Sequence, residues 1–279
     1  MQNDLKDKVC VITGGSGVLG SAISVGLAES GVKIAIIELD REKSEEFAKK
    51  LGSDYGIEAI GIHADVMDRN VLMAAKKKVN DKFGKTDILI NTAGGNSPQA
   101  TTKLTEIKPE DLDSLEDSFF GLEDTAISKV FSLNFMGTLL PISVFSKEMV
   151  EAGNGVILNV SSMSAFRALT KVPAYSAAKA AINSFTHWLA VHFGKTGVRV
   201  NAIAPGFFLT DQNRFLLTEK ENGNLTERGK KIIDNTPMGR FGDPEDLQGT
   251  CEFLVSSASN FLTGVVIPVD GGYSAFGGV

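Results

Sequence analysis

Seven short apolar runs, rich in β-branched residues, recur along the chain and alternate with amphipathic stretches. They span residues 9–12, 33–37, 59–62, 88–90, 156–160, 198–203 and 265–269. A strand that helices cover on both faces is apolar along its whole length, and an intervening helix connects two parallel strands. The pattern therefore predicts an α/β fold, in which a doubly wound sheet of seven parallel strands carries helices on both faces.

The chain has 279 residues, which is long for one domain, but α/β folds of this size commonly remain undivided. We expect residues 1–279 to form a single domain. Two stretches, at about 95–124 and 206–240, interrupt the alternation of strands and helices. Each follows a strand end on the side of the sheet where such folds bind ligands, so both are predicted to be insertions that cover a substrate.

Charge and hydropathy argue against large anionic partners and against a membrane. The formal net charge of −6 disfavours nucleic acid and anionic lipid surfaces. The N-terminus is polar and lacks the apolar core of a signal peptide. An uncharged run between Lys129 and Lys147 is short and includes the polar Asn134, which favours a buried helix over a membrane span.

Cysteine and histidine usage indicates a reducing compartment and no metal centre. Cys10 and Cys251 lie far apart in apolar stretches, so free buried thiols and a cytoplasmic location are expected. The three histidines, His63, His187 and His192, form no cluster with the spacing of metal ligands.

Glycines follow the first apolar run directly and precede an apolar helix. Gly15, Gly17 and Gly20 match G-x-G-x-x-G, a pattern that lets a backbone approach a pyrophosphate at a helix N-terminus. The pattern alone is equally typical of a tight turn, but here it stands between a strand and a helix. It predicts a Rossmann-type dinucleotide site.

An acidic residue lies at the distance that such a site requires. Glu38 ends the second apolar run, where a carboxylate accepts hydrogen bonds from the adenosine ribose and repels a 2′-phosphate. The next residue is Leu39, which offers no cation to that phosphate. We predict NAD(H) as the cofactor, with Arg41 as the nearby cation that leaves some use of NADP(H) open.

Polar residues close the third and fourth runs, at positions that border the adenosine half of a dinucleotide in this fold. The third run ends with Asp65 and Val66, and the fourth with Asn91. Asp65 could instead cap the following helix, and Asn91 could tie neighbouring strands together.

Tyr175 and Lys179 stand four residues apart in a predicted helix, so they share one face. A phenol releases its proton near pH 10 unless a positive charge stabilises the phenolate, and Lys179 could supply that charge. Ser162, at the end of a separate strand, could hold a substrate oxygen. Taken alone, the pair is as typical of an ordinary helix surface as of a catalytic site.

The motifs together resemble the short-chain dehydrogenase/reductase family over essentially the whole chain. The motifs that carry the resemblance are T13-G-G-S-G-V-L-G20, D65-V66, N91-T-A-G94, N134, S161-S162, Y175-S-A-A-K179, N201-A-I-A-P-G206 and V269-D-G-G272. The chain departs from the family at Val18, where a glycine is usual, and at Thr92, where an asparagine is usual.

The resemblance implies roles for four residues. Tyr175 is the general acid/base, Lys179 lowers its pKa and binds the nicotinamide ribose, and Ser162 orients the reacting carbonyl or alcohol. Asn134 holds a water that passes protons to Lys179; the alternative for Asn134 is a buried polar residue at a helix kink. The remaining implied cofactor contacts are Gly14, Gly15, Ser16, Gly17, Val18, Leu19, Gly20, Glu38, Asp65, Val66, Asn91, Ala93, Gly94, Pro205, Gly206, Phe208 and Thr210.

Within the family, the chain is similar to a bacterial group of D-mannonate oxidoreductases, also called fructuronate reductases. The similarity is carried by A93-G-G-N-S97, S118-F-F120, S161-S-M-S-A-F166, T170-K-V-P-A-Y175, L189-A-V-H-F193 and A204-P-G-F-F-L-T-D-Q-N213. It implies reversible hydride transfer between NADH and the C5 ketone of fructuronate, giving mannonate, in hexuronate breakdown. It also implies a homo-oligomer, commonly a tetramer.

A sugar acid needs a cation for its carboxylate and polar partners for its hydroxyls. Lys171 is the preferred cation because it lies between Ser162 and Tyr175, and Arg167 and Arg214 are the alternatives. The expected hydroxyl partners are Asn96, Gln212 and Asn213. Other functions stay open: a gluconate 5-dehydrogenase, a 3-oxoacyl reductase, or a nucleotide-sensing scaffold without activity.

Overall fold

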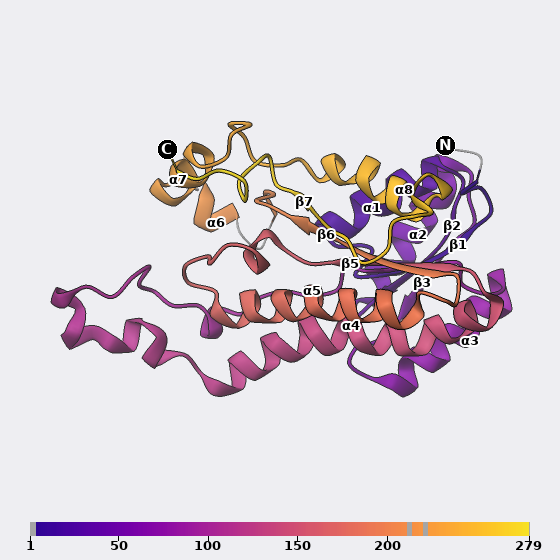
Figure 1. Cartoon of the computed structure of the whole chain (residues 1–279), viewed down its shortest axis with the longest axis horizontal. Helices are drawn as coiled ribbons and strands as arrows, with labels where there is room; N and C mark the ends of the chain where they lie inside the picture. The colour runs from indigo at the N-terminus through magenta and orange to yellow at the C-terminus, as the bar shows by residue number, and fades with distance from the viewer. Residues whose placement is uncertain (1–3, 211–213, 220–222, 279) are drawn as a thin grey trace.

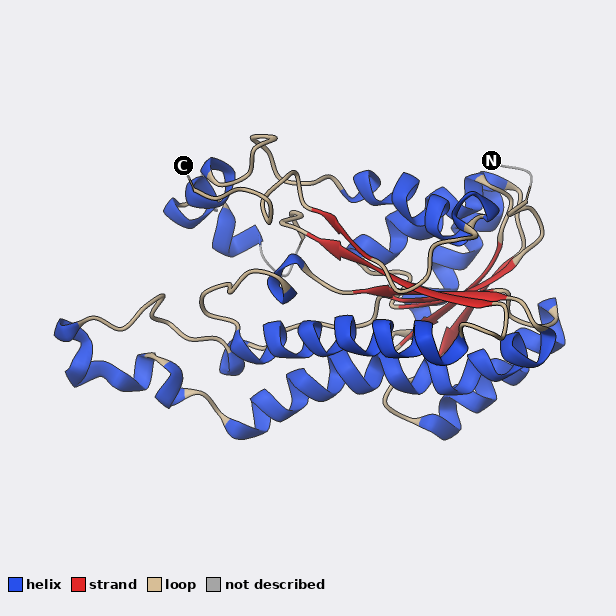
Figure 2. Cartoon of the chain, in the orientation of Figure 1, coloured by secondary structure: helices blue, strands red, loops and turns tan. Residues whose placement is uncertain are grey.

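The computed structural model describes residues 4–210, 214–219 and 223–278. Within these residues, seven strands form one sheet in the order β3-β2-β1-β4-β5-β6-β7, and every neighbouring pair is parallel (Figure 2). The strands are β1 (Val9–Thr13), β2 (Lys33–Glu38), β3 (Ala59–His63), β4 (Ile88–Asn91), β5 (Gly155–Val160), β6 (Val198–Pro205) and β7 (Val266–Val269). The predicted doubly wound sheet is confirmed.

Helices cover both faces of this sheet (Figure 1). One face carries α1 (Val18–Glu29), α2 (Arg41–Tyr55) and α8 (Gln248–Val255). The other carries α3 (Arg69–Phe83), α4 (Asp124–Ala152) and α5 (Pro173–Phe193). Two further helices, α6 (Arg214–Leu217) and α7 (Glu227–Asp234), lie beyond the sheet.

Alternate residues of each strand point into two separate cores. In β1, Cys10 and Ile12 pack with the α1 and α8 side, whereas Val9 and Val11 pack with the α3, α4 and α5 side. All four side chains are almost fully buried. Burial on both faces explains why the strands appear in the sequence as uninterrupted apolar runs.

The strand order reverses between β1 and β4, so the loops after these two strands diverge and leave a crevice. Ligands of open parallel sheets bind in such a crevice, at the carboxyl ends of the strands. The loops that follow β1, β4, β5 and β6 all open at this edge, which brings together the glycine-rich turn, Ser162 and the turn after Pro205.

The first insertion forms an arm, residues 97–123, built from the short 3₁₀ turns Pro98–Ala100, Pro109–Asp117 and Phe119–Gly121. The arm extends away from the sheet at the left of Figure 1. The backbone N–H of Thr102 donates to the carbonyl of Lys171 (3.0 Å), which ties the arm to the segment before α5.

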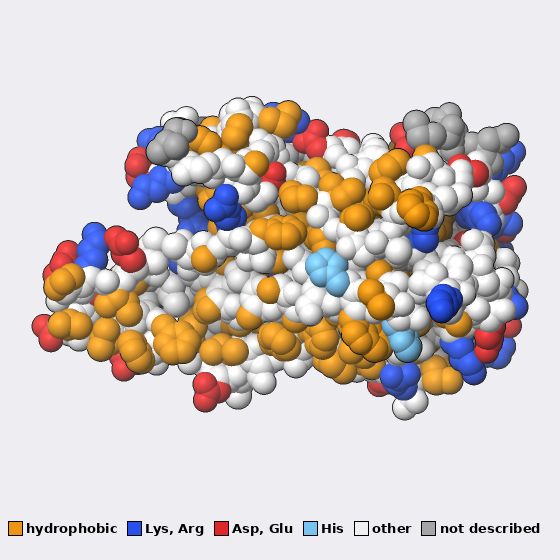
Figure 3. Space-filling model, viewed as in Figure 1, with side chains coloured by type: hydrophobic (Ala, Val, Ile, Leu, Met, Phe, Trp, Pro, Cys, Tyr) orange, Lys and Arg blue, Asp and Glu red, His pale blue; other side chains and the backbone are white. Residues whose placement is uncertain are grey.

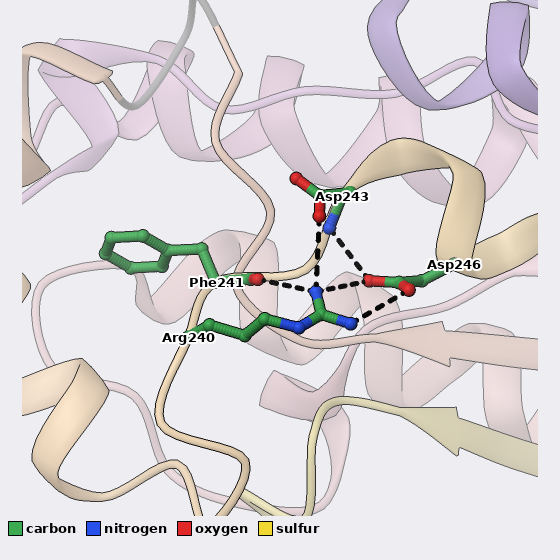
Figure 4. A network of polar contacts seen from close by, with 4 residues as sticks. All are labelled: Arg240, Phe241, Asp243 and Asp246. Carbon is green, nitrogen blue, oxygen red and sulfur yellow. Dashed lines mark hydrogen bonds and ion pairs between the residues drawn. The ribbon is translucent and has the colours of Figure 1, made fainter.

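The second insertion is closed at its base. Gly242 N donates to Phe207 O (2.9 Å), and Phe208 forms a parallel bridge with Gly242. Next to this bridge, Arg240 makes two bonds to the carboxylate of Asp246, at 2.6 and 3.0 Å (Figure 4). The two ends of residues 208–242 are therefore fastened side by side, at the start of the turn that leads into α8.

Helix α4 is long and apolar enough to cross a membrane by length and composition alone. Its buried side, which includes Phe145 and Met149, packs against the sheet, and it also contacts α3 and α5. This is the buried helix predicted for the uncharged run between residues 129 and 147.

Candidate active site

Tyr175, Lys179 and Ser162 meet at the carboxyl edge of the sheet. Tyr175 and Lys179 lie in the first two turns of α5, which starts at Pro173, and the Nζ of Lys179 is 5.5 Å from the centre of the Tyr175 ring. Ser162 follows β5, and its side chain interacts with Tyr175. The three groups predicted to handle the substrate oxygen and its proton are therefore brought together.

Lys179 is held in a nearly closed environment. Its side chain is 4% exposed, and its Nζ donates to the carbonyl of Val160 (2.8 Å). Burial lowers the pKa of Lys179 to about 8 from its ordinary 10.5, because a low-dielectric surrounding disfavours the charged form. Its protonation can therefore change within a physiological pH range.

Burial raises the pKa of the Tyr175 phenol above its ordinary value, and the hydrogen bond with Ser162 opposes that shift. The phenol is consequently protonated at neutral pH in the structure. Such a group is suited to donate a proton, which is what the reduction of a carbonyl requires.

Ser161, the neighbour of Ser162, has a structural role. Its hydroxyl contacts the side chain of Asn183 and the backbone carbonyl of Lys179, both on α5. These bonds fasten the end of β5 to α5, and so help to set the position of Ser162 relative to Lys179.

Asn134 is fully buried in α4 and binds the loop after β4. Its Nδ2 donates to the carbonyls of Gly95 (2.7 Å) and Val130 (2.8 Å), and its Oδ1 accepts from Gly95 N (3.3 Å). A Cβ on Gly94 would lie 2.6 Å from this Oδ1 and 3.5 Å from the Nζ of Lys179. Asn134 thus lies beside Lys179 and positions the glycine loop; its role in proton transfer stays a prediction.

The glycine-rich turn after β1 requires glycine at two positions. Gly14 has a φ of +65°, in the left-handed region, and a Cβ on Gly20 would lie 2.2 Å from the Gly14 carbonyl. The hydroxyl of Thr92 donates to the carbonyl of Thr13 at the start of this turn. Thr92, a departure from the family pattern, therefore supports the turn.

The start of α1 presents backbone N–H groups to the crevice. Its N-cap is Gly17, which has no side chain to satisfy them, and Val18, Leu19 and Gly20 border the crevice. Uncapped N–H groups at a helix N-terminus favour a phosphate. The local structure fits the predicted pyrophosphate position.

Glu38 is oriented by the same turn. The hydroxyl of Ser16 donates to Glu38 Oε2 (2.9 Å), and Leu39 N donates to Oε1 (3.1 Å). Arg41 points elsewhere and lies 3.9 Å from Glu45, one helical turn away. The cation that borders the crevice at the Glu38 end is Lys43, which no sequence motif indicated.

The two polar residues at the ends of β3 and β4 differ in their surroundings. Asp65 borders the crevice and accepts from Met67 N (2.8 Å), whereas Asp68 caps α3. Asn91 is 1% exposed, and its Nδ2 donates to Asn159 Oδ1 (2.9 Å) across β4 and β5. The side-chain bond of Asn91 is thus the strand tie that the sequence left open as the alternative.

The crevice is a cleft of about 690 Å³ that runs from Glu38 to Tyr175. The space-filling view is hollowed at its left, between the lobe of α6 and α7 and the arm (Figure 3). The predicted residues that line the cleft are Gly14, Gly17, Val18, Leu19, Gly20, Glu38, Asp65, Val66, Ala93, Gly94, Asn96, Ser162, Tyr175, Lys179, Pro205, Gly206, Phe208 and Thr210. Gly15, Ser16, Asn91, Asn134 and Lys171 are outside this lining, and Gln212 and Asn213 fall outside the described residues.

The predicted cations for a substrate carboxylate also lie away from the lining. Lys171 has a φ of +76°, and its carbonyl accepts from the arm. Arg167 Nε donates to the carbonyl of Ser274 (2.9 Å), and Arg214 is exposed on α6. The lining instead includes Arg228 of α7, a residue that no local sequence pattern indicated.

The cleft also shows what each insertion contributes. From the first insertion only Gly95 and Asn96 line it. Among the described residues, the second contributes Gly206, Phe207, Phe208, Thr210, Leu217 and Arg228. Substrate cover by the whole of residues 95–124 therefore remains a prediction.

Known proteins share this architecture. A family model described as Enoyl-(Acyl carrier protein) reductase matches residues 16–274. The uncharacterised oxidoreductase UxuB of Bacillus subtilis is 49% identical over 280 residues, covering 100% of this chain and 99% of the relative. A 2-dehydro-3-deoxy-D-gluconate 5-dehydrogenase of Dickeya dadantii is 34% identical, covering 98% of this chain and 97% of the relative.

A solved structure is similar over almost the full length. It is that of a Haemophilus influenzae protein, provisionally named a D-mannonate oxidoreductase, with bound NAD. The TM-score is 0.93 at 46% identity, and the match covers 99% of this chain and 98% of that chain. Matches of this extent, together with the geometry of the cleft, show that the chain belongs to the short-chain dehydrogenase/reductase family.

Proposed function

We propose that the protein is an NAD(H)-dependent oxidoreductase that interconverts D-fructuronate and D-mannonate by hydride transfer at C5. The observation that carries this proposal is the meeting of Tyr175, Ser162 and Lys179 in a cleft whose other end holds the glycine-rich turn and Glu38. The substrate is supported by the Haemophilus influenzae protein, whose provisional name is D-mannonate oxidoreductase.

The residues present fit a dinucleotide. The N-terminus of α1 would hold the pyrophosphate, and Glu38, positioned by Ser16, would bind the adenosine ribose. The structure solved with NAD supports this cofactor over NADP, as does a carboxylate at position 38. When bound, NADH supplies the hydride that reaches the ketone carbon.

The chain's own residues handle the oxygen and its proton. The hydroxyl of Ser162 would donate a hydrogen bond to the ketone oxygen and orient it. As that oxygen gains charge, the Tyr175 phenol would transfer its proton to it, and the alcohol forms. The ammonium of Lys179, 5.5 Å from the ring centre, would stabilise the phenolate left behind.

An NADH oxidation assay on a panel of keto sugar acids tests the proposal. The panel is fructuronate, tagaturonate and 5-ketogluconate, with NADPH as the comparison cofactor. We expect the highest catalytic efficiency with fructuronate and NADH. Faster turnover of 5-ketogluconate would reassign the substrate, and a preference for NADPH would contradict the cofactor.

A related sugar-acid activity is the second candidate. The Dickeya dadantii relative is named a 2-dehydro-3-deoxy-D-gluconate 5-dehydrogenase, and another at 33% identity has the same name. These proteins also act, by name, at C5 of a six-carbon acid. Oxidation of 2-dehydro-3-deoxy-D-gluconate with NAD, measured beside oxidation of D-mannonate, separates this candidate from the first.

We also propose a cytoplasmic homo-oligomer, a tetramer as the family resemblance implies. Both cysteines are free and buried, which suits a reducing compartment. Aromatic rings follow one another along α4 and α5, from Phe131 and Phe135 to Phe185, Trp188 and His192. Trp188 is 57% exposed, and an exposed aromatic row of this kind is typical of a subunit interface.

A further inference from the structure

Arg228 reaches the substrate end of the cleft. It lies on α7, it is half-buried, and its Nη1 is 3.5 Å from the hydroxyl of Thr170. Thr170 belongs to the segment that connects Ser162 with Tyr175, and its neighbours Leu169 and Val172 also line the cleft. Arg228 is therefore on the Tyr175 side of the cleft and away from Glu38.

The backbone that carries Arg228 is fixed by close packing. A Cβ on Gly229, the next residue, would lie 2.3 Å from the carbonyl of Leu217, so α7 rests directly on α6. Thr226 caps α7 by accepting from Gly229 N (3.1 Å), and Thr226 N donates to Leu217 O (3.0 Å). Leu217 itself lines the cleft, so the packing directs this side of α7 toward it.

Charge in the cleft is unevenly distributed. Its acidic lining residues, Glu38 and Asp65, belong to the nucleotide end, as does Lys43. At the other end the lining cations are Lys179 and Arg228. Figure 3 shows Lys and Arg side chains along the edge of the hollow beneath α6 and α7.

The guanidinium has capacity for a ligand. No ion pair between Arg228 and a carboxylate is found within residues 4–210, 214–219 and 223–278. The contact with Thr170 is at the long limit of a hydrogen bond, and a guanidinium carries five N–H donors. A planar fork of this kind matches a carboxylate with two parallel bonds.

We infer that Arg228 binds the carboxylate of the substrate and thereby selects sugar acids over uncharged sugars. The inference rests on the proposed function, because it assumes that a hexuronate-type ketone occupies the cleft with its reacting carbonyl at Tyr175 and Ser162. Arg228 takes the role predicted for Lys171, which is outside the lining of the cleft.

A matched pair of ketones tests the inference. D-Fructose has the carbon skeleton of D-fructuronate with a hydroxymethyl group in place of the carboxylate. The ratio of the catalytic efficiencies for fructuronate and fructose, both with NADH, measures how strongly the enzyme recognises the substrate carboxylate. It is measured for the wild type, Arg228→Gln, Arg228→Lys and Lys171→Ala, and for the control Lys231→Gln, which removes an exposed charge from the same helix. NADH binding and thermal unfolding are measured for each variant.

In the wild type we expect fructuronate to be preferred. In Arg228→Gln that preference falls about 10- to 100-fold, mainly through KM, because a charge-assisted bidentate contact is lost. Arg228→Lys retains part of the preference, since it keeps the charge and loses the fork. Lys231→Gln and Lys171→Ala keep the wild-type ratio, and NADH binding is unchanged in all variants.

The alternative outcomes separate the inference from the proposed function. If Arg228→Gln keeps the preference and Lys171→Ala loses it, the inference is wrong and the function stands. If Arg228→Gln weakens NADH binding as much as it raises KM, Arg228 serves the cofactor and the inference is again wrong. If another keto acid is the better substrate and Arg228→Gln removes the preference for its charge, the inference holds and the named substrate falls. A wild type that prefers fructose overturns both.

Discussion

The Nζ of Lys179 lies 5.5 Å from the centre of the Tyr175 ring, and both groups are shielded from solvent strongly enough to shift their pKa values in opposite directions. Burial disfavours the charged form of each, so the phenol keeps its proton and the amine releases its proton more readily. Placing a positive charge beside a phenol in such surroundings costs stability. Burial outweighs other influences on the Tyr175 pKa here, so the lowering of that pKa by Lys179, which the family resemblance implies, stays a prediction.

Removing the phenolic hydroxyl should abolish most turnover and leave the cofactor site intact. We expect Tyr175→Phe to lower kcat for fructuronate reduction by about 10²-fold or more, since it deletes the proposed general acid. NADH affinity, measured by fluorescence titration, should stay within about twofold of the wild type. Tyr55→Phe, on the far end of α2, is the control. More than about a tenth of wild-type activity in Tyr175→Phe would rule out its catalytic role.

Replacing Lys179 should stabilise the protein while inactivating it. The folded pKa of about 8 lies below the ordinary 10.5, a difference that corresponds to about 3 kcal/mol. Lys179→Met removes that cost and loses the bond to the Val160 carbonyl, worth about 1 kcal/mol. We expect the free energy of unfolding at pH 7 to rise by about 1–2 kcal/mol.

The pH dependence has a definite sign. Between pH 8 and 10.5 the unfolded chain holds the Lys179 proton that the folded chain has released, so this group makes stability increase with pH in that window. Below pH 8 its cost is constant. The buried thiols of Cys10 and Cys251, whose pKa values burial raises, act in the opposite direction over this range, so the effect of Lys179 is taken as a difference between variants. From pH 7 to pH 9.5, urea unfolding should show the wild type and the exposed control Lys195→Met gaining stability relative to Lys179→Met. An equal pH dependence in Lys179→Met and the wild type would contradict the assignment.

Cofactor choice should depend on Glu38. Glu38→Ser removes an acceptor for the ribose hydroxyls and the repulsion of a 2′-phosphate, so the ratio of catalytic efficiencies with NADH and NADPH should fall at least about 10-fold. Arg41→Gln should leave that ratio unchanged, because Arg41 faces Glu45 and lies outside the cleft. If this ratio changed in Arg41→Gln and not in Glu38→Ser, cofactor choice would depend on Arg41 and not on Glu38.

A methyl group at residue 94 should disturb the proton-handling groups. In Gly94→Ala the new Cβ would lie 2.6 Å from Asn134 Oδ1, closer than carbon and oxygen tolerate, and 3.5 Å from the Nζ of Lys179. We expect kcat to fall at least about 10-fold, with a loss of about 1–3 kcal/mol in stability. Gly249→Ala is the matched control, since a Cβ there meets nothing within 4 Å. Equal kinetics for the two variants would show that the loop can shift without cost.

A charge in the aromatic row should separate the subunits. Trp188 stacks on Phe185 and His192, with ring centres 6.2 and 4.6 Å away. Trp188→Glu should reduce the mass measured by light scattering toward that of one chain, because an interface would have to bury the new carboxylate. Phe261→Glu changes a more exposed aromatic side chain outside the row and should leave the mass unaltered. A monomeric wild type would refute the oligomer at once.

Most of the nucleotide end could be predicted from the sequence because local rules determine it. The strands are buried on both faces, which makes their apolar runs visible, and Gly14 and Gly20 are required by backbone geometry at one turn.

The proposed catalytic pair could also be predicted. Tyr175 and Lys179 are four residues apart on one helix, so their proximity follows from helix geometry alone.

The substrate end depends on contacts between distant parts of the chain. Arg228 meets Thr170 across 58 residues, through two short helices whose packing no periodic pattern indicates. Lys171 was predicted to bind the substrate because it lies between Ser162 and Tyr175 in the sequence. In the structure Lys171 itself has a left-handed backbone conformation, and its carbonyl accepts a hydrogen bond from the arm. Closeness in sequence to Ser162 and Tyr175 therefore did not predict which cation lines the cleft.

The closed base of the second insertion has an evolutionary consequence. Residues 208–242 leave and rejoin the fold at one point, held by Gly242 with Phe207 and by Arg240 with Asp246. A relative could acquire a different segment between these anchors while the sheet, the glycine-rich turn, Tyr175 and Lys179 stay unchanged. Exchange of this one segment offers such enzymes a route to new substrates, because the glycine-rich turn and the residues proposed to transfer the proton lie elsewhere.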